Sequence, residues 1–210
     1  MSNITDEFVE GPQAFLSKYV VQVANAAQLG PKNAKGTRDV YFWLVAGNNV
    51  ALKEAGATVT TKIKAYWLPW LTKEATTLDL KEEAEYFFTS QLTGCRFSLL
   101  TKEGEPPKVV HIAGTLERGQ RNTKEKGIVD TMGGSGAVKA RRLSVSDRKT
   151  LGHGYSGQSS DPSSAFVYGL LDKESKAWAF HAQIVKAALI ESVNLKTLPT
   201  PEILNPAYAI

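Results

Sequence analysis

Cysteine, histidine and methionine are scarce in this chain, with one, three and two among 210 residues. A single cysteine excludes an intrachain disulfide, which is typical of a reducing compartment or of a protein that acts in one. No apolar run approaches the ~20 residues that a membrane-spanning helix needs, so we expect no membrane insertion. The first residues lack the basic and apolar blocks of a secretory signal. We therefore expect an exported protein to leave its cell without a cleaved signal peptide.

The excess of basic over acidic residues is also small, because 25 basic and 21 acidic residues leave a net charge of +4. This surplus is small and scattered, which argues against nucleic acid as the partner. The cysteine and the histidines are far apart, and no two of them have a zinc-ligand spacing, so we expect no metal site. Hydrophobic residues make up 42% of the chain, which is enough to build a core.

Hydrophobic periodicity predicts one α+β domain over residues 1–210. Helices are expected over residues 13–29 and 79–94, the second starting at a capping box of Asp79 and Glu82. The polar, glycine-rich segments 117–136 and 147–164 and the tail from Leu198 are interpreted as surface loops. Strands are expected over 39–45, 50–53, 59–67, 95–100, 109–113 and 138–145, with a late hairpin over 165–171 and 178–185.

Cys95 is the candidate nucleophile. It follows Gly94, which permits a sharp turn and leaves space for a reacting carbonyl, at an expected helix-to-strand junction where backbone N–H groups can stabilise an oxyanion. His111 falls on the next expected strand, and a nucleophilic thiol needs a base within reach. An isolated cysteine is more often a small buried hydrophobe, and an isolated histidine a half-buried strand residue. The two positions alone leave catalysis and packing both open.

Three segments extend this pair: Trp67-Leu68-Pro69-Trp70, the run from Phe87 to Cys95, and Val110-His111-Ile112. Together they resemble the Burkholderia lethal factor family, whose site is similar to that of the cytotoxic necrotizing factors. Leu92-Thr93-Gly94-Cys95 matches the Leu-Ser/Thr-Gly-Cys motif of these toxins. The resemblance covers roughly the middle quarter of the chain. The cysteine-to-histidine spacing is longer here, with the extra residues in the turn from Gly104 to Lys108.

The resemblance implies a sandwich of mixed β-sheets flanked by helices and long loops, and a glutamine deamidase that acts as a toxin or effector. It makes Cys95 the nucleophile and His111 its base, and Thr89 the residue that orients the imidazole through its hydroxyl or its carbonyl. Leu92, Thr93 and Gly94 form the backbone motif beside the oxyanion. The family's target is a translation-initiation RNA helicase, which implies a host protein as partner and the host cytoplasm as the place of action.

The residue types predict a reaction that needs no metal or organic cofactor. His111 is expected to lower the pKa of Cys95 by forming a thiolate–imidazolium pair, and the thiolate attacks a glutamine side-chain amide. Ammonia leaves, and water activated by His111 hydrolyses the thioester to glutamate. The same two residues also fit a cysteine protease or a transglutaminase.

A non-catalytic binding module for a protein or a polyanion is the other hypothesis. The basic run Lys139-Ala140-Arg141-Arg142 follows Met132-Gly133-Gly134-Ser135-Gly136, and such glycine-rich segments can bind phosphate. It lacks the Gly-Lys-Ser/Thr ending of a P-loop. Trp67 and Trp70 fit either a substrate platform or the core. His153 is expected in a loop, and His181 as a partly buried residue of an apolar strand.

Overall fold

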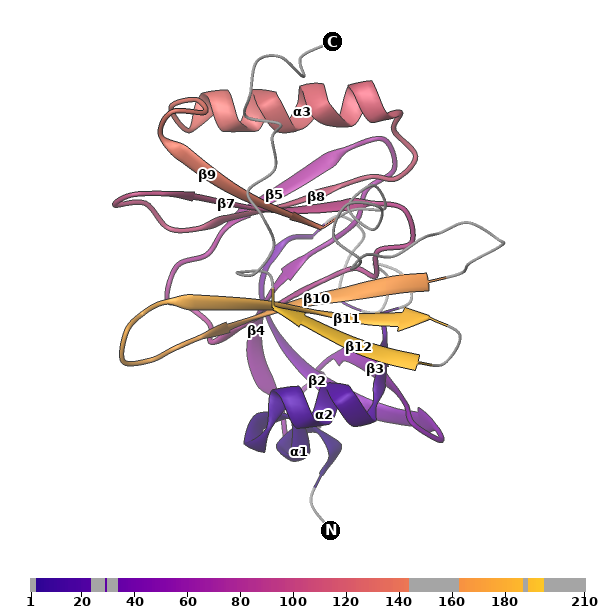
Figure 1. The fold of residues 1–210 in the computed structure, drawn as a ribbon. Coiled ribbons are helices and arrows are strands. Elements are labelled where there is room, and N and C mark those ends of the chain that lie inside the picture. The colour runs from indigo at the N-terminus through magenta and orange to yellow at the C-terminus, as the bar shows by residue number, and fades with distance from the viewer. Residues whose placement is uncertain (1–2, 24–28, 30–33, 144–162, 187–188, 195–210) are drawn as a thin grey trace.

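The structure is a computed structural model that describes residues 3–23, 29, 34–143, 163–186 and 189–194 (Figure 1). These residues form helices α1 (Ile4–Glu10), α2 (Pro12–Lys18) and α3 (Arg118–Thr131). None of the helices in this part of the chain has the length and apolar character needed to cross a membrane. The strands are β1 (Val20–Gln22), β2 (Gly36–Ala46), β3 (Asn49–Glu54), β4 (Ile63–Leu68), β5 (Ala75–Asp79), β6 (Tyr86–Thr89), β7 (Arg96–Lys102), β8 (Lys108–Ile112), β9 (Val138–Leu143), β10 (Ser163–Leu171), β11 (Trp178–Lys186) and β12 (Leu189–Asn194).

The strands form two sheets. Sheet A has eight strands in the order β1-β3-β2-β4-β6-β10-β11-β12 and is mixed, because β1 pairs with β3, and β4 with β6, in parallel. Sheet B has four antiparallel strands in the order β5-β8-β7-β9. Sheet B lies between α3 and sheet A, and α1 and α2 lie at the opposite end of the molecule (Figure 1). The predicted α+β fold is confirmed, with the difference that only the larger sheet is mixed.

Gln183 in β11 joins the two ends of sheet A. Its side-chain carbonyl accepts a hydrogen bond from the Val21 N–H of β1 at 3.0 Å, and its amide donates to the Tyr19 carbonyl at 2.6 Å. The side chain is buried, so these bonds satisfy polar atoms that would otherwise be costly in the interior. Sheet A is thereby nearly closed on itself.

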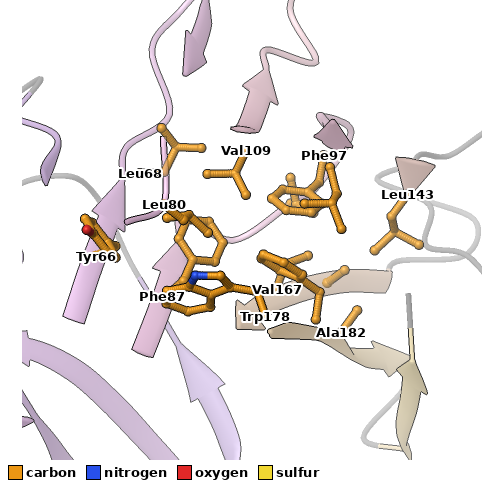
Figure 2. Packing of buried hydrophobic residues seen from close by; sticks show 14 of the residues in the cluster. Tyr66, Leu68, Leu80, Phe87, Phe97, Val109, Leu143, Val167, Trp178 and Ala182 are labelled. Carbon is orange, nitrogen blue, oxygen red and sulfur yellow. The ribbon is translucent and has the colours of Figure 1, made fainter. Parts of the chain in front are cut away.

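A hydrophobic layer fills the space between the two sheets. Figure 2 shows Phe97 and Val109 of sheet B packed opposite Phe87 and Val167 of sheet A. Side chains alternate along each strand, so the residues next to Phe97 and Val109 face α3 instead. Cys95 belongs to the layer between the sheets, which places its thiol on the side of sheet B that faces sheet A.

Helix α3 is anchored to the outer face of sheet B by a buried carboxylate. Glu125 is 1% exposed and accepts hydrogen bonds from Arg96 Nη1 at 2.6 Å and from Ser98 Oγ at 2.5 Å. Arg142 Nη2 lies 2.9 Å from the same carboxylate. A buried charge is tolerated when it is paired and hydrogen-bonded, and here the pairing also aligns α3 with β7 and β9.

The helix predicted over residues 13–29 is wrong. Helix α2 ends at Lys18, and the chain continues as β1, where Val20 and Val21 favour an extended backbone and pair with β3. The aromatic and aliphatic spacing that suggested one long helix belongs to α2 and to this short strand. Residues 24–28 lie outside the described residues.

The helix predicted over residues 79–94 is also wrong, because β6 occupies this segment. Phe87 packs between the sheets and Phe88 on the other face of sheet A, so the aromatic run has strand periodicity. Asp79 caps no helix and instead forms an ion pair with Lys108. Parallel pairing with β4 and burial on both faces outweigh the local helix signal.

The loop predicted over residues 117–136 is wrong, because most of it is α3. The Glu117 N–H donates to Gln120 Oε1 at 3.1 Å, which satisfies a backbone group at the start of the helix. Glu125 and Val129 are buried one turn apart and hold the helix against sheet B. Internal glycines and the small number of apolar residues concealed the helical pattern in the sequence.

The other predicted strands are confirmed with small shifts of their ends, except that β4 begins at Ile63 rather than near residue 59. The hairpin predicted late in the chain is formed by β10 and β11. Of the predicted loop 147–164, residues 147–162 lie outside the described residues, and so does the tail from Leu198.

Candidate active site

Thr89 and His111 meet in the interior between the two sheets. Thr89 is the last residue of β6 in sheet A, and His111 lies in β8 of sheet B. Thr89 Oγ1 is 2.8 Å from His111 Nδ1 and 2.8 Å from the carbonyl oxygen of Leu68. Both side chains are buried, at 0% and 1% exposure. The hydroxyl of Thr89, rather than its carbonyl, is therefore the group in contact with the imidazole.

This geometry determines the tautomer of His111. A hydroxyl has one proton, and that of Thr89 is directed to the Leu68 carbonyl, which has only acceptor capacity. Thr89 Oγ1 must then accept from His111 Nδ1, so the ring proton is on Nδ1. Nε2 carries a lone pair, is buried, and has no hydrogen-bond partner among the described residues. An imidazole in this state is available as a base.

Cys95 lies on the same face of sheet B as His111. Phe97 pairs directly with His111 across the antiparallel β7–β8 ladder. Cys95 precedes Phe97 by two residues and packs in the same layer, so its side chain projects to the same side as the imidazole and lies diagonally from it. The two residues were predicted on adjacent strands, and the structure has His111 in β8 and Cys95 directly before β7, on the same face of sheet B.

The thiol lies just beneath the surface. Cys95 is 6% exposed, but Gly114, whose N–H donates to its Sγ at 3.3 Å, is an exposed residue. Gly94 borders open space, because an added Cβ there would meet no atom within 4 Å. The backbone of Gly94 has a φ of 151°, a conformation that side chains disfavour, so the expected need for glycine before the cysteine has a structural reason.

Burial favours the neutral forms of both side chains. Desolvation raises the pKa of the Cys95 thiol, and this outweighs the lowering by the Gly114 and Thr93 N–H groups and by Arg121. Desolvation also lowers the pKa of His111 to about 3. The expected thiolate–imidazolium pair with a lowered cysteine pKa is therefore wrong for the resting site, which holds a thiol and a neutral imidazole.

The Leu92-Thr93-Gly94 motif is held by backbone contacts. The Leu92 N–H donates to the Ala165 carbonyl at 2.7 Å, which ties the motif to β10 and occupies this N–H group. The Thr93 N–H is directed to the sulfur of Cys95. The predicted helix-to-strand junction is wrong, because Cys95 follows a short irregular segment after β6.

Two site residues were not predicted from the sequence. Gly114 approaches the Gly94–Cys95 peptide so closely that an added Cβ would lie 2.6 Å from the Gly94 carbonyl carbon. Arg121 of α3 donates from Nη1 to the Gly94 carbonyl oxygen at 3.0 Å. Position at the end of a strand was the only signal for Gly114. Arg121 had none, because its segment was interpreted as a loop.

The remaining candidate residues have structural surroundings. Trp67 is 1% exposed within the core of sheet A, so it forms no platform, and Trp70 packs partly buried against two core clusters. His181 lies in a strand as predicted, but it is buried rather than partly buried and stacks on Tyr168 with ring centroids 5.2 Å apart. In the basic run, Arg142 faces Glu125. His153 lies outside the described residues.

Within the described ranges, no group of three or more His, Cys, Asp or Glu side chains could hold a metal ion. Comparison with known proteins assigns the chain to no family: no protein-family model matches it, and no curated protein matches it significantly.

Proposed function

We propose that this protein is a cysteine-dependent amidohydrolase that converts a glutamine side chain of another protein to glutamate, with Cys95 as nucleophile and His111 as base. The observation that carries the proposal is the state of His111. Its Nδ1 is occupied by Thr89, and its buried Nε2 lacks a partner on the face that also carries the thiol. A buried, unpaired acceptor is costly, and such groups are concentrated at functional sites.

The reaction begins with neutral partners. Nε2 of His111 takes the thiol proton while Cys95 Sγ attacks the amide carbon of the substrate, so that an S–C bond forms and the carbonyl oxygen becomes an oxyanion. The imidazolium then gives its proton to the amide nitrogen, the C–N bond breaks, and ammonia leaves. The product of this half is a thioester between Cys95 and the glutamyl side chain.

The second half uses water. Nε2 takes a proton from a water molecule as its oxygen attacks the thioester carbon, and the C–S bond breaks. The proton returns to the sulfur, which restores the thiol and leaves glutamate. Thr89 supports both halves, because its Oγ1 holds the Nδ1 proton and stabilises the imidazolium that forms twice in each cycle.

The resemblance of Leu92-Thr93-Gly94-Cys95 and its neighbouring segments to the lethal factor family supports deamidation over peptide hydrolysis or transfer to an amine. It also supports a host cytoplasmic protein as substrate and a role as a secreted effector. Substrate choice in enzymes resides mainly in loops, so loops outside the matched segments determine the individual target.

The test is mass spectrometry of host-cell lysate, and of a purified translation-initiation RNA helicase, after incubation with the full chain. The buffer contains water enriched in the heavy oxygen isotope. We expect wild type to convert a glutamine to glutamate that carries one solvent oxygen, and Cys95→Ser and His111→Asn to lose this conversion about equally, because residues that act as a unit are not additive.

Thr101→Ala is a matched control, since it removes a partly exposed hydroxyl near the other end of β7, where it donates to the Lys139 carbonyl. It should retain deamidation as long as the fold is intact. New chain termini in the lysate would indicate a protease, and crosslinks to added amines a transglutaminase. Activity that survives Cys95→Ser would contradict the proposed nucleophile.

A further inference from the structure

We propose that Arg121 and Gly114 form a clamp on the Gly94–Cys95 peptide that positions the nucleophile for the proposed reaction. The proposal rests on the proposed function and adds two positioning residues to it. Arg121 holds the carbonyl end of the peptide, and Gly114 lies against its face and its thiol.

The contact of Arg121 acts on both ends of one peptide group. Its guanidinium donates to the Gly94 carbonyl oxygen at 3.0 Å, and the N–H of that same peptide belongs to Cys95. A cation on the carbonyl polarises the peptide, which makes the Cys95 N–H a stronger donor. This N–H is adjacent to the attacking sulfur, where an oxyanion forms in acyl transfer.

Gly114 fixes the same peptide from another side. A Cβ at this position would lie 2.6, 2.7 and 2.9 Å from the Gly94 carbon, the Gly94 oxygen and the Cys95 nitrogen. No side chain fits in such a space, so the backbone of Gly114 packs directly on the peptide plane. Its N–H reaches the sulfur at 3.3 Å and favours the thiolate that develops during attack.

The anchoring of α3 explains how Arg121 keeps its place. Arg121 and Glu125 are four residues apart and thus share one face of the helix. Glu125 is bonded to Arg96 and Ser98, and Asn122 accepts from the same arginine at 3.0 Å. The buried ion pair therefore aligns the helix so that its neighbouring turn presents Arg121 to Gly94.

Burial, two backbone amides and the charge of Arg121 act on the titration of Cys95. Arg121, on α3, lowers the pKa of the thiol through its charge, and His111, on β8, is neutral at ordinary pH. Arg96 is next in the chain but is bonded to Glu125 on the opposite face of sheet B. Loss of the Arg121 charge should therefore make the thiol a weaker acid.

The experiment measures the thiol titration from the ultraviolet absorbance of the thiolate, with Cys95→Ser as the blank. The chain has one cysteine, so the difference belongs to this residue alone. We expect Arg121→Gln to move the midpoint to higher pH, and Arg121→Lys to remain nearer to wild type because it retains the charge. Arg118→Gln, which removes an exposed arginine from the same helix, is the matched control and should leave the midpoint unchanged.

Deamidation provides the second readout. Arg121→Gln should lower kcat/KM about 10- to 100-fold, mainly through kcat, with partial recovery in Arg121→Lys. Arg121→Met serves as a second uncharged variant if melting shows that the glutamine unfolds the protein. An Arg121→Gln midpoint equal to that of wild type would overturn the clamp. A wild type without deamidation but with the expected midpoint shift would overturn the proposed function and leave the clamp standing.

Discussion

Thr89 Oγ1 and His111 Nδ1 are 2.8 Å apart, across the interface between sheets A and B. The contact is directional, because the same hydroxyl donates its only proton to the Leu68 carbonyl. A residue of one sheet therefore determines which nitrogen of a residue in the other sheet is free to act as a base. Packing of the two sheets and, in the proposed reaction, the state of the base depend on the same contact.

Replacing Thr89 with valine should distinguish the effect of the side chain's shape from that of its hydroxyl's hydrogen bonds. The side chain keeps its size, but the Nδ1 proton loses its acceptor and the Leu68 carbonyl its donor. We expect kcat/KM to fall about 100-fold or more, because the base loses its tautomer, and stability to fall by about 1–3 kcal/mol. Nitrogen NMR of the His111 ring and steady-state kinetics measure the two effects.

Thr89→Ser is the control for this change, because it retains the hydroxyl. It should keep Nδ1 protonated and most of the activity. If Thr89→Val leaves the ring nitrogens and the rate unchanged, the hydroxyl does not orient the base.

The pH dependence of kcat/KM should lack the decrease near pH 6.5 that protonation of an ordinary histidine causes. Burial lowers the pKa of His111 to about 3, so the imidazole remains an unprotonated base well below its usual range. We expect kcat/KM for deamidation to be nearly constant between about pH 5 and pH 8. A loss of activity centred near pH 6.5 would show that the imidazole titrates normally.

The stability of the fold should decline in acid for the same reason. In the unfolded chain His111 is protonated near its usual pKa, whereas in the folded chain it stays neutral until about pH 3. As the pH falls below about 6.5, protonation of His111 therefore increasingly favours the unfolded state. Between pH 7 and pH 4 this contributes a loss of about 3 kcal/mol. Denaturant unfolding of wild type and His111→Asn at both pH values measures it.

The asparagine variant retains an N–H donor for Thr89 and has no titrating ring. Its own stability should therefore fall less over this interval, whatever its absolute value. Equal pH dependence in the two proteins would assign the acid sensitivity to other groups.

The sequence predicted the central part of this architecture. Alternation in the segments around Cys95 and His111 indicated adjacent strands, because the periodicity of a half-buried strand is local and strong. Thr89 was expected to contact His111 through its hydroxyl or its carbonyl, and the structure shows the hydroxyl. These positions lie within or beside regular strands, where pattern and structure agree.

The rest depended on contacts that are distant in the chain. Residues 118–131 have little apolar periodicity, and their helix is held by Glu125 through arginine and serine side chains of sheet B. Arg121 lies on this helix, one turn before Glu125, and from there it contacts the Gly94 carbonyl. The lowered cysteine pKa was predicted from the presence of a nearby histidine, whereas burial of both groups has the larger effect.

Gly114→Ala should impair the site through its backbone. The added methyl group would come within 3 Å of the Gly94–Cys95 peptide, so that peptide or the turn at Gly114 must shift. We expect deamidation to fall about 100-fold, because small displacements of a nucleophile are costly.

Gly127→Ala is the control, since its site in α3 is open and alanine should stabilise the helix by about 1 kcal/mol. Paired activity and melting measurements distinguish them, and an active Gly114→Ala would show that the close approach is not needed.

Glu125→Gln should loosen α3 from sheet B. The amide keeps the size of the side chain but removes the charge that Arg96 faces at 2.6 Å, and Arg96 is 3% exposed. Leaving a buried charge without its partner destabilises by about 3–5 kcal/mol, whereas Asp130→Asn in the exposed pair with Lys126 should change stability by less than about 1 kcal/mol. Chemical denaturation gives the two free energies.

Hydrogen exchange should show α3 opening in Glu125→Gln before the strands of sheet B, because the lost contacts are those that join helix to sheet. If the two variants are equally stable, the buried pair does not anchor the helix, and Arg121 must be held at Gly94 by other contacts.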